Sequence, residues 1–236
     1  MNKYIILTTQ RSGSTWLVDT LNGVENSKAY SELFLRTDKK LRVAGANDVE
    51  QFCQVSGMRP FKTFRYLDRV YGGNECIGIK LMYKQLLRNP EIFFYILSRR
   101  ISVVHLVRKN SFNVVLSRML KSVRGVAHVE QKLEDNSRVY VNVQKVSRSI
   151  RIIEAQKSFF RAILNFFRIE HLEVNYEALV DDHEVLNHIL RFVGCNGCIK
   201  YRSKLVKIDD RSVSDKIQNY AEVEQFIKKW QSLERN

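Results

Sequence analysis

The chain begins with an alternation of apolar and polar segments that predicts its first two structural elements. Residues 4–8 form a short apolar run rich in β-branched side chains, which predicts a buried strand. A polar segment follows, and in residues 14–22 the spacing of Leu17 and Leu21 places both side chains on one face of a predicted helix. This order of strand, tight turn and helix is typical of the opening of a nucleotide-binding fold.

The same alternation continues along the rest of the chain. Further strands are predicted at 76–82, 101–108 and 172–176, and helices after Asn89 and Pro90 and at 110–121, 150–169, 185–193 and 221–233. The apolar side of the segment 150–169 is made by Phe159, Phe160, Ile163, Leu164 and Phe167. Strands that alternate with helices favour a mostly parallel sheet, which binds ligands at the carboxyl ends of its strands. We therefore expect an α/β fold that forms a single domain over residues 1–236. The segment 123–146 has the least regular pattern and is a candidate lid.

Charge adds a class of partner to this picture. The 236 residues include 39 Lys and Arg against 25 Asp and Glu, a net charge of +14, which predicts an anionic partner such as a nucleic acid, a lipid surface or a phosphorylated or sulfated small molecule. The basic residues are densest between Glu91 and Glu130, where no acidic residue interrupts them. Phe112 is the only aromatic residue among those at 99–124, which disfavours a nucleic-acid-binding module.

The remaining bulk features predict a cytoplasmic protein with no membrane span. The apolar part of residues 1–7 is too short for a signal peptide, and no apolar run approaches the roughly 18 residues of a membrane span. Cys195 and Cys198 have the C-x-x-C spacing of some zinc and redox sites, but Cys53 and Cys76 form no second tight pair. Inert thiols around a turn are therefore expected.

The polar turn at residues 9–15 is the first candidate site. A turn between a strand and a helix directs several backbone N–H groups to one point, and the helix N-terminus adds positive potential there. Arg11 adds a planar cationic donor, and the next residues are small or hydroxylated: Ser12, Gly13, Ser14 and Thr15. The turn is thus suited to a terminal phosphate or sulfate, although an ordinary capped helix start is also compatible with this composition.

The turn differs from the ATP- and GTP-binding P-loop in two respects. Gly13, Ser14 and Thr15 stand where that motif has Gly, Lys and Ser or Thr, so the lysine that reaches the β- and γ-phosphates is missing. The strand 101–108 ends in Arg108, where a magnesium-binding Asp is expected. A P-loop kinase or NTPase is therefore the weaker alternative, and we expect no metal.

A second candidate anion site follows the strand 101–108. Arg108 and Lys109 stand at its carboxyl end, and Ser117 lies on the next predicted helix. Together with the first turn they suit a nucleotide that is phosphorylated at both ends.

With these two motifs the chain resembles the sulfotransferases that use PAPS (3′-phosphoadenosine-5′-phosphosulfate), and it is most similar to bacterial carbohydrate sulfotransferases of the nodulation-factor and trehalose type. Residues 8–17 resemble the loop that holds the 5′-phosphosulfate, and 105–110 with 116–118 resemble the Arg…Ser pair that holds the 3′-phosphate. Weaker similarities lie at 31–34, 78–83, 174–179 and 217–223. Many members place the serine eight residues after the arginine, whereas Ser117 is nine after Arg108 and eight after Lys109, so both basic residues are candidates.

The resemblance implies a P-loop-like three-layer sandwich fold. It also implies an enzyme that transfers a sulfuryl group from PAPS to a hydroxyl of a carbohydrate or other small molecule and releases PAP. No metal is required for this reaction. Arg11 and the amides of residues 12–15 would steady the sulfonate and the departing phosphate. Glu32 matches the family's general base. His105 is the rival base, but its position in mid-strand favours a core histidine.

Three further residues are candidates for supporting roles. Lys80 is expected to touch the transferring group or the acceptor, with an ordinary ion pair as the alternative. Trp16 would flank the nucleotide or pack in the core, and Arg211 would close over the nucleotide. The sequence is also compatible with a family member that binds the nucleotide without catalysing transfer. It does not indicate an oligomeric state.

Overall fold

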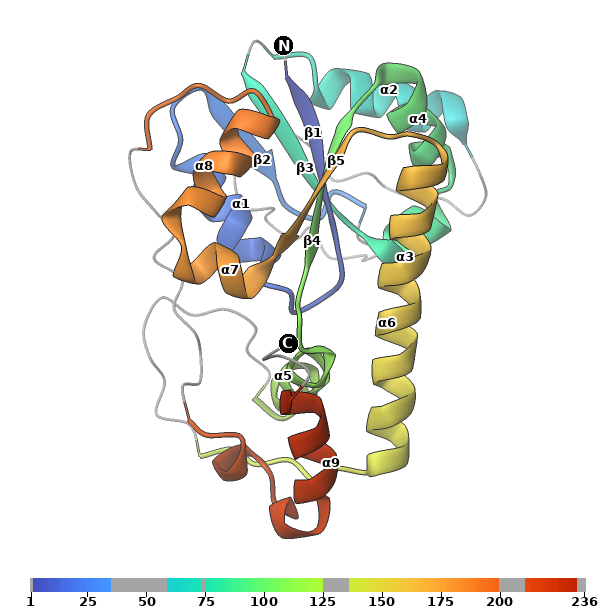
Figure 1. Ribbon diagram of the computed structural model, residues 1–236. Coiled ribbons are helices and arrows are strands. Elements are labelled where there is room, and N and C mark those ends of the chain that lie inside the picture. The colour runs from blue at the N-terminus through green and yellow to red at the C-terminus, as the bar shows by residue number, and fades with distance from the viewer. Residues whose placement is uncertain (1, 35–58, 74, 125–135, 200–210, 233–236) are drawn as a thin grey trace. The chain divides into compact units, whose positions relative to one another are not determined.

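The computed structural model describes residues 2–34, 59–73, 75–124, 136–199 and 211–232 (Figure 1). It divides into two compact units, one of residues 1–107 and 159–203 and the other of residues 108–158 and 204–236. Each unit is described by itself below. The expectation of a single domain over 1–236 stays a prediction.

The first unit is built on a five-stranded parallel sheet. Its strands are β1 (Lys3–Thr8), β2 (Ser27–Tyr30), β3 (Cys76–Met82), β4 (Ser102–Val107) and β5 (His171–Asn175). Their order is β2-β3-β1-β4-β5, and every pair is parallel. The expected α/β class with a parallel central sheet is therefore confirmed, while β2 is an additional strand that the hydrophobic pattern did not predict.

Helices cover both faces of this sheet, because alternate residues of each strand point to opposite sides. Ile5 and Leu7 of β1 join one core cluster together with side chains of α2 (Pro60–Val70), α3 (Tyr83–Arg88), α4 (Glu91–Arg99) and the C-terminal part of α6 (Val143–Phe166). Tyr4 and Ile6 join the opposite cluster with α1 (Ser14–Asn22), α7 (Tyr176–Asp181) and α8 (His183–Phe192). This is the expected three-layer sandwich.

Among the described residues no helix has the length and apolarity needed to cross a membrane.

The strand register brings the predicted first site to one edge of the sheet. Thr8, the last residue of β1, lies opposite Met82 of β3 and Leu106 of β4. On the next strand, Tyr30 lies opposite Ile79, which precedes Lys80. The segments that leave β1, β2 and β3 therefore begin at the same edge.

The outer side of β2 is occupied by a side chain. The amide of Asn22, the last residue of α1, donates to the Ala29 carbonyl (2.9 Å) and accepts from the Ala29 N–H (2.7 Å). Asn22 thus satisfies both backbone groups that Ala29 turns away from β3.

The second unit is helical in its described part. It contains α5 (Ser111–Arg124), α6 up to Ser158, a 3₁₀ turn (Ser214–Lys216) and α9 (Tyr220–Ser232). Phe112, Ile150 and Ile227 belong to its core cluster. The helix predicted from residue 150 begins earlier, at Val143, because Asn142 caps it by accepting from the N–H of Lys145 (3.0 Å). Of the lid predicted at 123–146, residues 125–135 lie outside the described residues, so the lid stays a prediction.

Candidate functional site

The turn between β1 and α1 has a backbone that few residues other than glycine adopt. Arg11 and Gly13 have positive φ angles of 64° and 79°. A Cβ atom on Gly13 would lie 2.0 Å from ring carbons of Tyr176, the first residue of α7. The first helical bond of α1 runs from the Leu17 N–H to the Gly13 carbonyl, so the amides of the three residues before Leu17 are not used within the helix. Such amides at a helix N-terminus form an anion-binding site.

Hydroxyl groups hold this turn from the inside. Thr8 donates to the Leu106 carbonyl in β4 at 2.7 Å, and the Ser12 hydroxyl lies 2.5 Å from the Thr8 hydroxyl and 2.8 Å from the Thr9 carbonyl oxygen. Ser12 is fully buried and Ser14 is nearly so. In this arrangement the Ser12 side chain shapes the turn, and its contribution to an anion site would come from its backbone N–H.

Three of the predicted site residues meet beside this turn. The Lys80 ammonium lies 3.3 Å from the Thr15 hydroxyl, with which it hydrogen-bonds, and 3.2 Å from Oε1 of Glu32. Thr15 is the second residue of α1, Lys80 lies in β3, and Glu32 follows the end of β2. Three elements that are distant in sequence thus place a cation between a hydroxyl of the anion site and a carboxylate.

Gln85 is a fourth member that the sequence did not single out. Its Nε2 donates to Oε2 of Glu32 at 3.2 Å, and its Oε1 accepts from the Met82 N–H at 2.9 Å. Each Glu32 oxygen therefore has its own partner, which fixes the plane of the carboxylate. Glutamine at the third position of a helix that follows a strand directly was the one available signal, because such a side chain can reach back to the N-cap N–H.

Burial sets the electrostatics of this cluster. Lys80 is 3% exposed, and loss of hydration lowers its pKa, while the Glu32 carboxylate opposes that shift. The Glu32 side chain keeps 18% of its surface exposed. A mostly buried carboxylate next to a buried ammonium can accept a proton from a bound hydroxyl while the ammonium faces developing negative charge.

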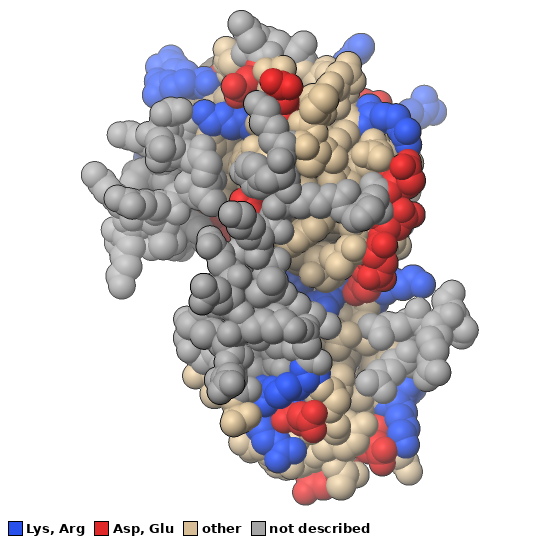
Figure 2. All heavy atoms as spheres, turned by 90° about the vertical axis from the view of Figure 1, so that its left-hand side faces the viewer, with Lys and Arg blue, Asp and Glu red and all other residues tan. Residues whose placement is uncertain are grey.

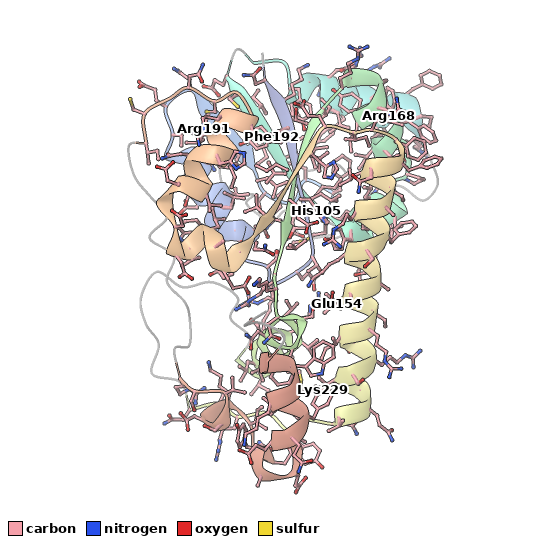
Figure 3. All side chains as sticks on the ribbon, in the orientation of Figure 1. His105, Glu154, Arg168, Arg191, Phe192 and Lys229 are labelled. Carbon is pink, nitrogen blue, oxygen red and sulfur yellow. The ribbon has the colours of Figure 1, made fainter. Side chains whose placement is uncertain are left out.

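His105 belongs to a separate buried network in the middle of the sheet (Figure 3). Its Nδ1 lies 3.0 Å from Oε2 of Glu173, and its Nε2 lies 2.6 Å from the Tyr83 hydroxyl. Because a carboxylate only accepts, Nδ1 carries the proton, and in the neutral ring Nε2 accepts from Tyr83. Arg161 binds Glu173 with two hydrogen bonds of 2.9 and 2.7 Å. His105 is fully buried with both nitrogens paired, which agrees with its interpretation as a core histidine.

This network makes a testable contribution to acid stability. The hydrogen bond from His105, helped by Arg161 and opposed by burial, lowers the pKa of Glu173 to about 2. The unfolded value is about 4.3, so the stabilisation is complete above that pH and is lost as the pH falls toward 2. We expect Glu173→Gln to lower the free energy of unfolding by about 1–2 kcal/mol at pH 7, allowing for solvent screening of this partly exposed carboxylate. When this free energy is measured by urea unfolding at a series of pH values, the variant should lose less stability than the unaltered chain as the pH falls from about 4 toward 2. Glu170→Gln, at an exposed carboxylate bound to Ser102, is the control; an equal loss of stability at low pH for both variants would contradict the assignment.

The second predicted anion site lies at the start of the second unit. Arg108 is partly exposed and Lys109 exposed, and Ser117 lies on the second turn of α5. Asn110 caps α5 by accepting from the N–H groups of Phe112 (2.9 Å) and Asn113 (3.3 Å). Its Nδ2 is buried and finds no hydrogen-bond partner among the described residues. A buried donor at a helix N-terminus, directly after two cationic residues in the sequence, fits a bound phosphate oxygen.

A buried lysine supports this segment from α6. Lys157 donates to the Arg108 carbonyl (2.6 Å) and the Ser111 hydroxyl (2.9 Å) and lies 3.0 Å from Oε1 of Glu154, which also accepts from Ser111. Figure 3 labels Glu154 on this helix. Lys157 is therefore a residue that holds the backbone of Arg108, and the hydrophobic pattern of α6 gave no sign of it.

The other predicted residues lie as follows. Trp16 packs partly buried against the core cluster on the α1 side of the sheet, which supports its packing role and leaves a nucleotide contact as a prediction. Arg211 donates to the Ser137 carbonyl at 2.9 Å within the second unit. No group of three or more His, Cys, Asp or Glu suited to a metal ion occurs among the described residues.

The cysteines form no disulfide in the described part of the chain. Cys195 is buried and Cys198 is exposed, and Cys53 lies outside the described residues. A hydrogen bond between the thiols of Cys76 and Cys195 lowers the pKa of Cys195 and raises that of Cys76.

Comparison with known proteins gives a family match over most of the chain. The family model described as Stf0 sulphotransferase matches residues 3–222. No curated protein matches the chain.

Proposed function

Since the chain belongs to the Stf0 sulphotransferase family, we propose that it moves a sulfuryl group from PAPS to a carbohydrate hydroxyl, with Glu32 as the general base. Family membership implies sulfuryl transfer; the donor, the acceptor and the base are the proposal. One observation carries it. The Lys80 ammonium contacts both Thr15 of the anion-binding turn and the carboxylate of Glu32.

The roles of these residues follow from the chemistry of the transfer. A bond forms between the acceptor oxygen and sulfur while the bond between sulfur and the 5′-phosphate oxygen breaks, so negative charge grows on the departing phosphate. The backbone N–H groups of residues 14–16, together with the Arg11 side chain, would stabilise that charge. Glu32 would take the acceptor's hydroxyl proton, and Lys80 would face the sulfonate oxygens. Gln85 would keep the Glu32 carboxylate in the plane that the proton transfer requires.

The second anion site would hold the 3′-phosphate of the same nucleotide. Arg108 and Lys109 supply charge, Ser117 a hydroxyl, and Asn110 a buried donor that has no partner among the described residues. This assignment distinguishes PAPS from nucleotides without a 3′-phosphate.

Calorimetric titration with PAP, AMP and ATP-Mg tests the donor. We expect PAP to bind at least about tenfold more tightly than AMP, because two charge-assisted contacts to the 3′-phosphate are worth more than 1.4 kcal/mol together. At a free concentration of about 100 times its Kd, PAP should raise the free energy of unfolding by about 2.7 kcal/mol. Equal affinity for PAP and AMP would remove the 3′-phosphate site, and preference for ATP-Mg would favour a kinase or NTPase.

Single substitutions then decide which cation binds the 3′-phosphate. Of the variants Arg108→Met and Lys109→Met, the one that removes the cation bound to the 3′-phosphate should lose the preference for PAP over AMP, while its affinity for AMP stays unchanged. Lys121→Met, at an exposed lysine on α5, is the matched control for a general loss of positive charge.

A further inference from the structure

Four phenylalanines form a continuous, largely exposed cluster in the first unit, which we name the aromatic face. Phe93 and Phe94 belong to α4, Phe166 is the last residue of α6, and Phe167 directly follows it. The rings of Phe93 and Phe167 meet edge to face at 4.9 Å between centroids, those of Phe166 and Phe167 at 5.0 Å, and those of Phe93 and Phe94 at 6.2 Å. Phe94 is 57% exposed, Phe166 80% and Phe167 46%.

This exposure follows from the way α4 and α6 pack. Ile92, Tyr95 and Ile96 turn one side of α4 to the core, and Phe160 and Leu164 do the same for α6. Phe94 and Phe166 therefore stand on the sides that face away from the sheet. Contiguous exposed apolar surface of this kind is uncommon on monomeric proteins and usually marks a place of interaction.

The helices around the aromatic face carry mainly positive charge. Arg168 directly follows Phe167, with a left-handed φ of 51°, and Figure 3 labels it at the end of α6 beside α4. The other basic residues on this layer are Lys62, Arg65, Arg69, Lys84, Arg88, Arg99 and Arg161, of which Arg161 is paired with Glu173. On the same helices Asp68 is paired with Arg99, and Glu91 is buried and bound to Thr63.

The opposite layer of the sheet has the reverse character. Figure 2 looks onto that side and shows a strip of acidic side chains. The charged residues of α1, α7 and α8 are Asp19, Glu177, Asp181, Glu184 and Arg191. In these helices Val180 is the large apolar side chain that stands out as exposed.

We propose that the aromatic face docks reversibly on an anionic lipid bilayer. Phenyl rings have no polar group and gain most from entering the acyl boundary, and surrounding Lys and Arg gain from anionic headgroups. A second copy docked face to face would oppose like charges. One docked on the acidic layer would meet, in the helices α1, α7 and α8 of the described part, Val180 as the large exposed apolar side chain. Nucleic acid would satisfy the charges but leave rings on convex helix surfaces without a stacking groove.

Vesicle sedimentation tests this surface without reference to the sulfuryl transfer. We expect the full chain to bind phosphatidylcholine vesicles that contain phosphatidylglycerol, to bind pure phosphatidylcholine much less, and to be released by high salt. Phe94→Ser with Phe166→Ser should weaken binding at least tenfold, since each buried ring contributes more than a factor of about ten when fully inserted. Arg88→Gln with Arg168→Asn should weaken it about tenfold through lost headgroup attraction.

Controls separate docking from misfolding and from other partners. Tyr140→Ser removes an aromatic ring that is 60% exposed in the second unit and should leave vesicle binding unchanged. Each variant should unfold at the urea midpoint of the unaltered chain. Absence of binding to phosphatidylglycerol vesicles would overturn the proposal, as would a dimer that Phe166→Ser dissociates, or binding to poly(U) that the two serine substitutions abolish.

Discussion

Replacing Glu32 with glutamine should lower kcat for sulfuryl transfer by about 10²–10⁴-fold while PAP affinity changes little, because the amide cannot take the acceptor's proton. Glutamine keeps the size and shape of the side chain, and its single carbonyl oxygen can accept from either Lys80 or Gln85, but not from both. The measurement is transfer of ³⁵S from labelled PAPS to a disaccharide acceptor, alongside calorimetric PAP binding.

Two further variants make that result specific. Glu32→Asp keeps the charge but withdraws the carboxylate by one methylene, so we expect a smaller loss of kcat. Glu75→Gln changes an exposed carboxylate just before β3 and should have no effect. If Glu32→Gln transfers sulfate at the rate of the unaltered chain, Glu32 is not the base.

Replacing Gly13 with alanine should abolish measurable PAP binding, with a loss of at least about 100-fold, and destabilise the fold by about 2–4 kcal/mol. The new Cβ would lie 2.0 Å from the Tyr176 ring, and the φ of 79° is strained for any residue with a side chain. Either the ring or the turn must move, and a displaced turn no longer directs its amides to one point. Isothermal titration and urea unfolding measure the two effects.

The source of the Gly13 effect can be separated into contact and strain. Gly72→Ala, where the nearest neighbour of the added Cβ lies at 3.2 Å and φ is not positive, is the control. Gly13→Ala combined with Tyr176→Ser removes the clash but not the φ strain, so PAP binding should return in part. Tight binding by Gly13→Ala alone would contradict the proposed role of the turn.

Local motifs were readable from the sequence because they depend on residue types at fixed positions beside a strand. Gly13 after β1 is of this kind, whereas Glu32 was named only through the family resemblance, and the register then brings Lys80 between Thr15 and Glu32. Gln85, Glu173 and Lys157 were missed because their roles come from partners far away in the sequence. No periodicity along the chain encodes such a pair.

The strand β2 and the helix α6 show two other limits. β2 reads Ser-Lys-Ala-Tyr, too short and polar for an apolar run, and its extended form depends on β3 and Asn22. In α6 the expected apolar side included Phe159 and Phe167, yet these side chains are 49% and 46% exposed, whereas Phe160 and Leu164 are buried. A hydrophobic period predicts which side chains share a face, but burial requires a neighbouring element to cover all of it.

The amide of Asn22 also bears on the solubility of this chain. An uncovered strand at the border of a sheet is a template on which another molecule can add a strand and start aggregation. Because Asn22 already takes both outward backbone groups of Ala29, an incoming strand would have to displace it first. The border strand next to Glu32 is thereby protected from intermolecular pairing without a further strand of its own.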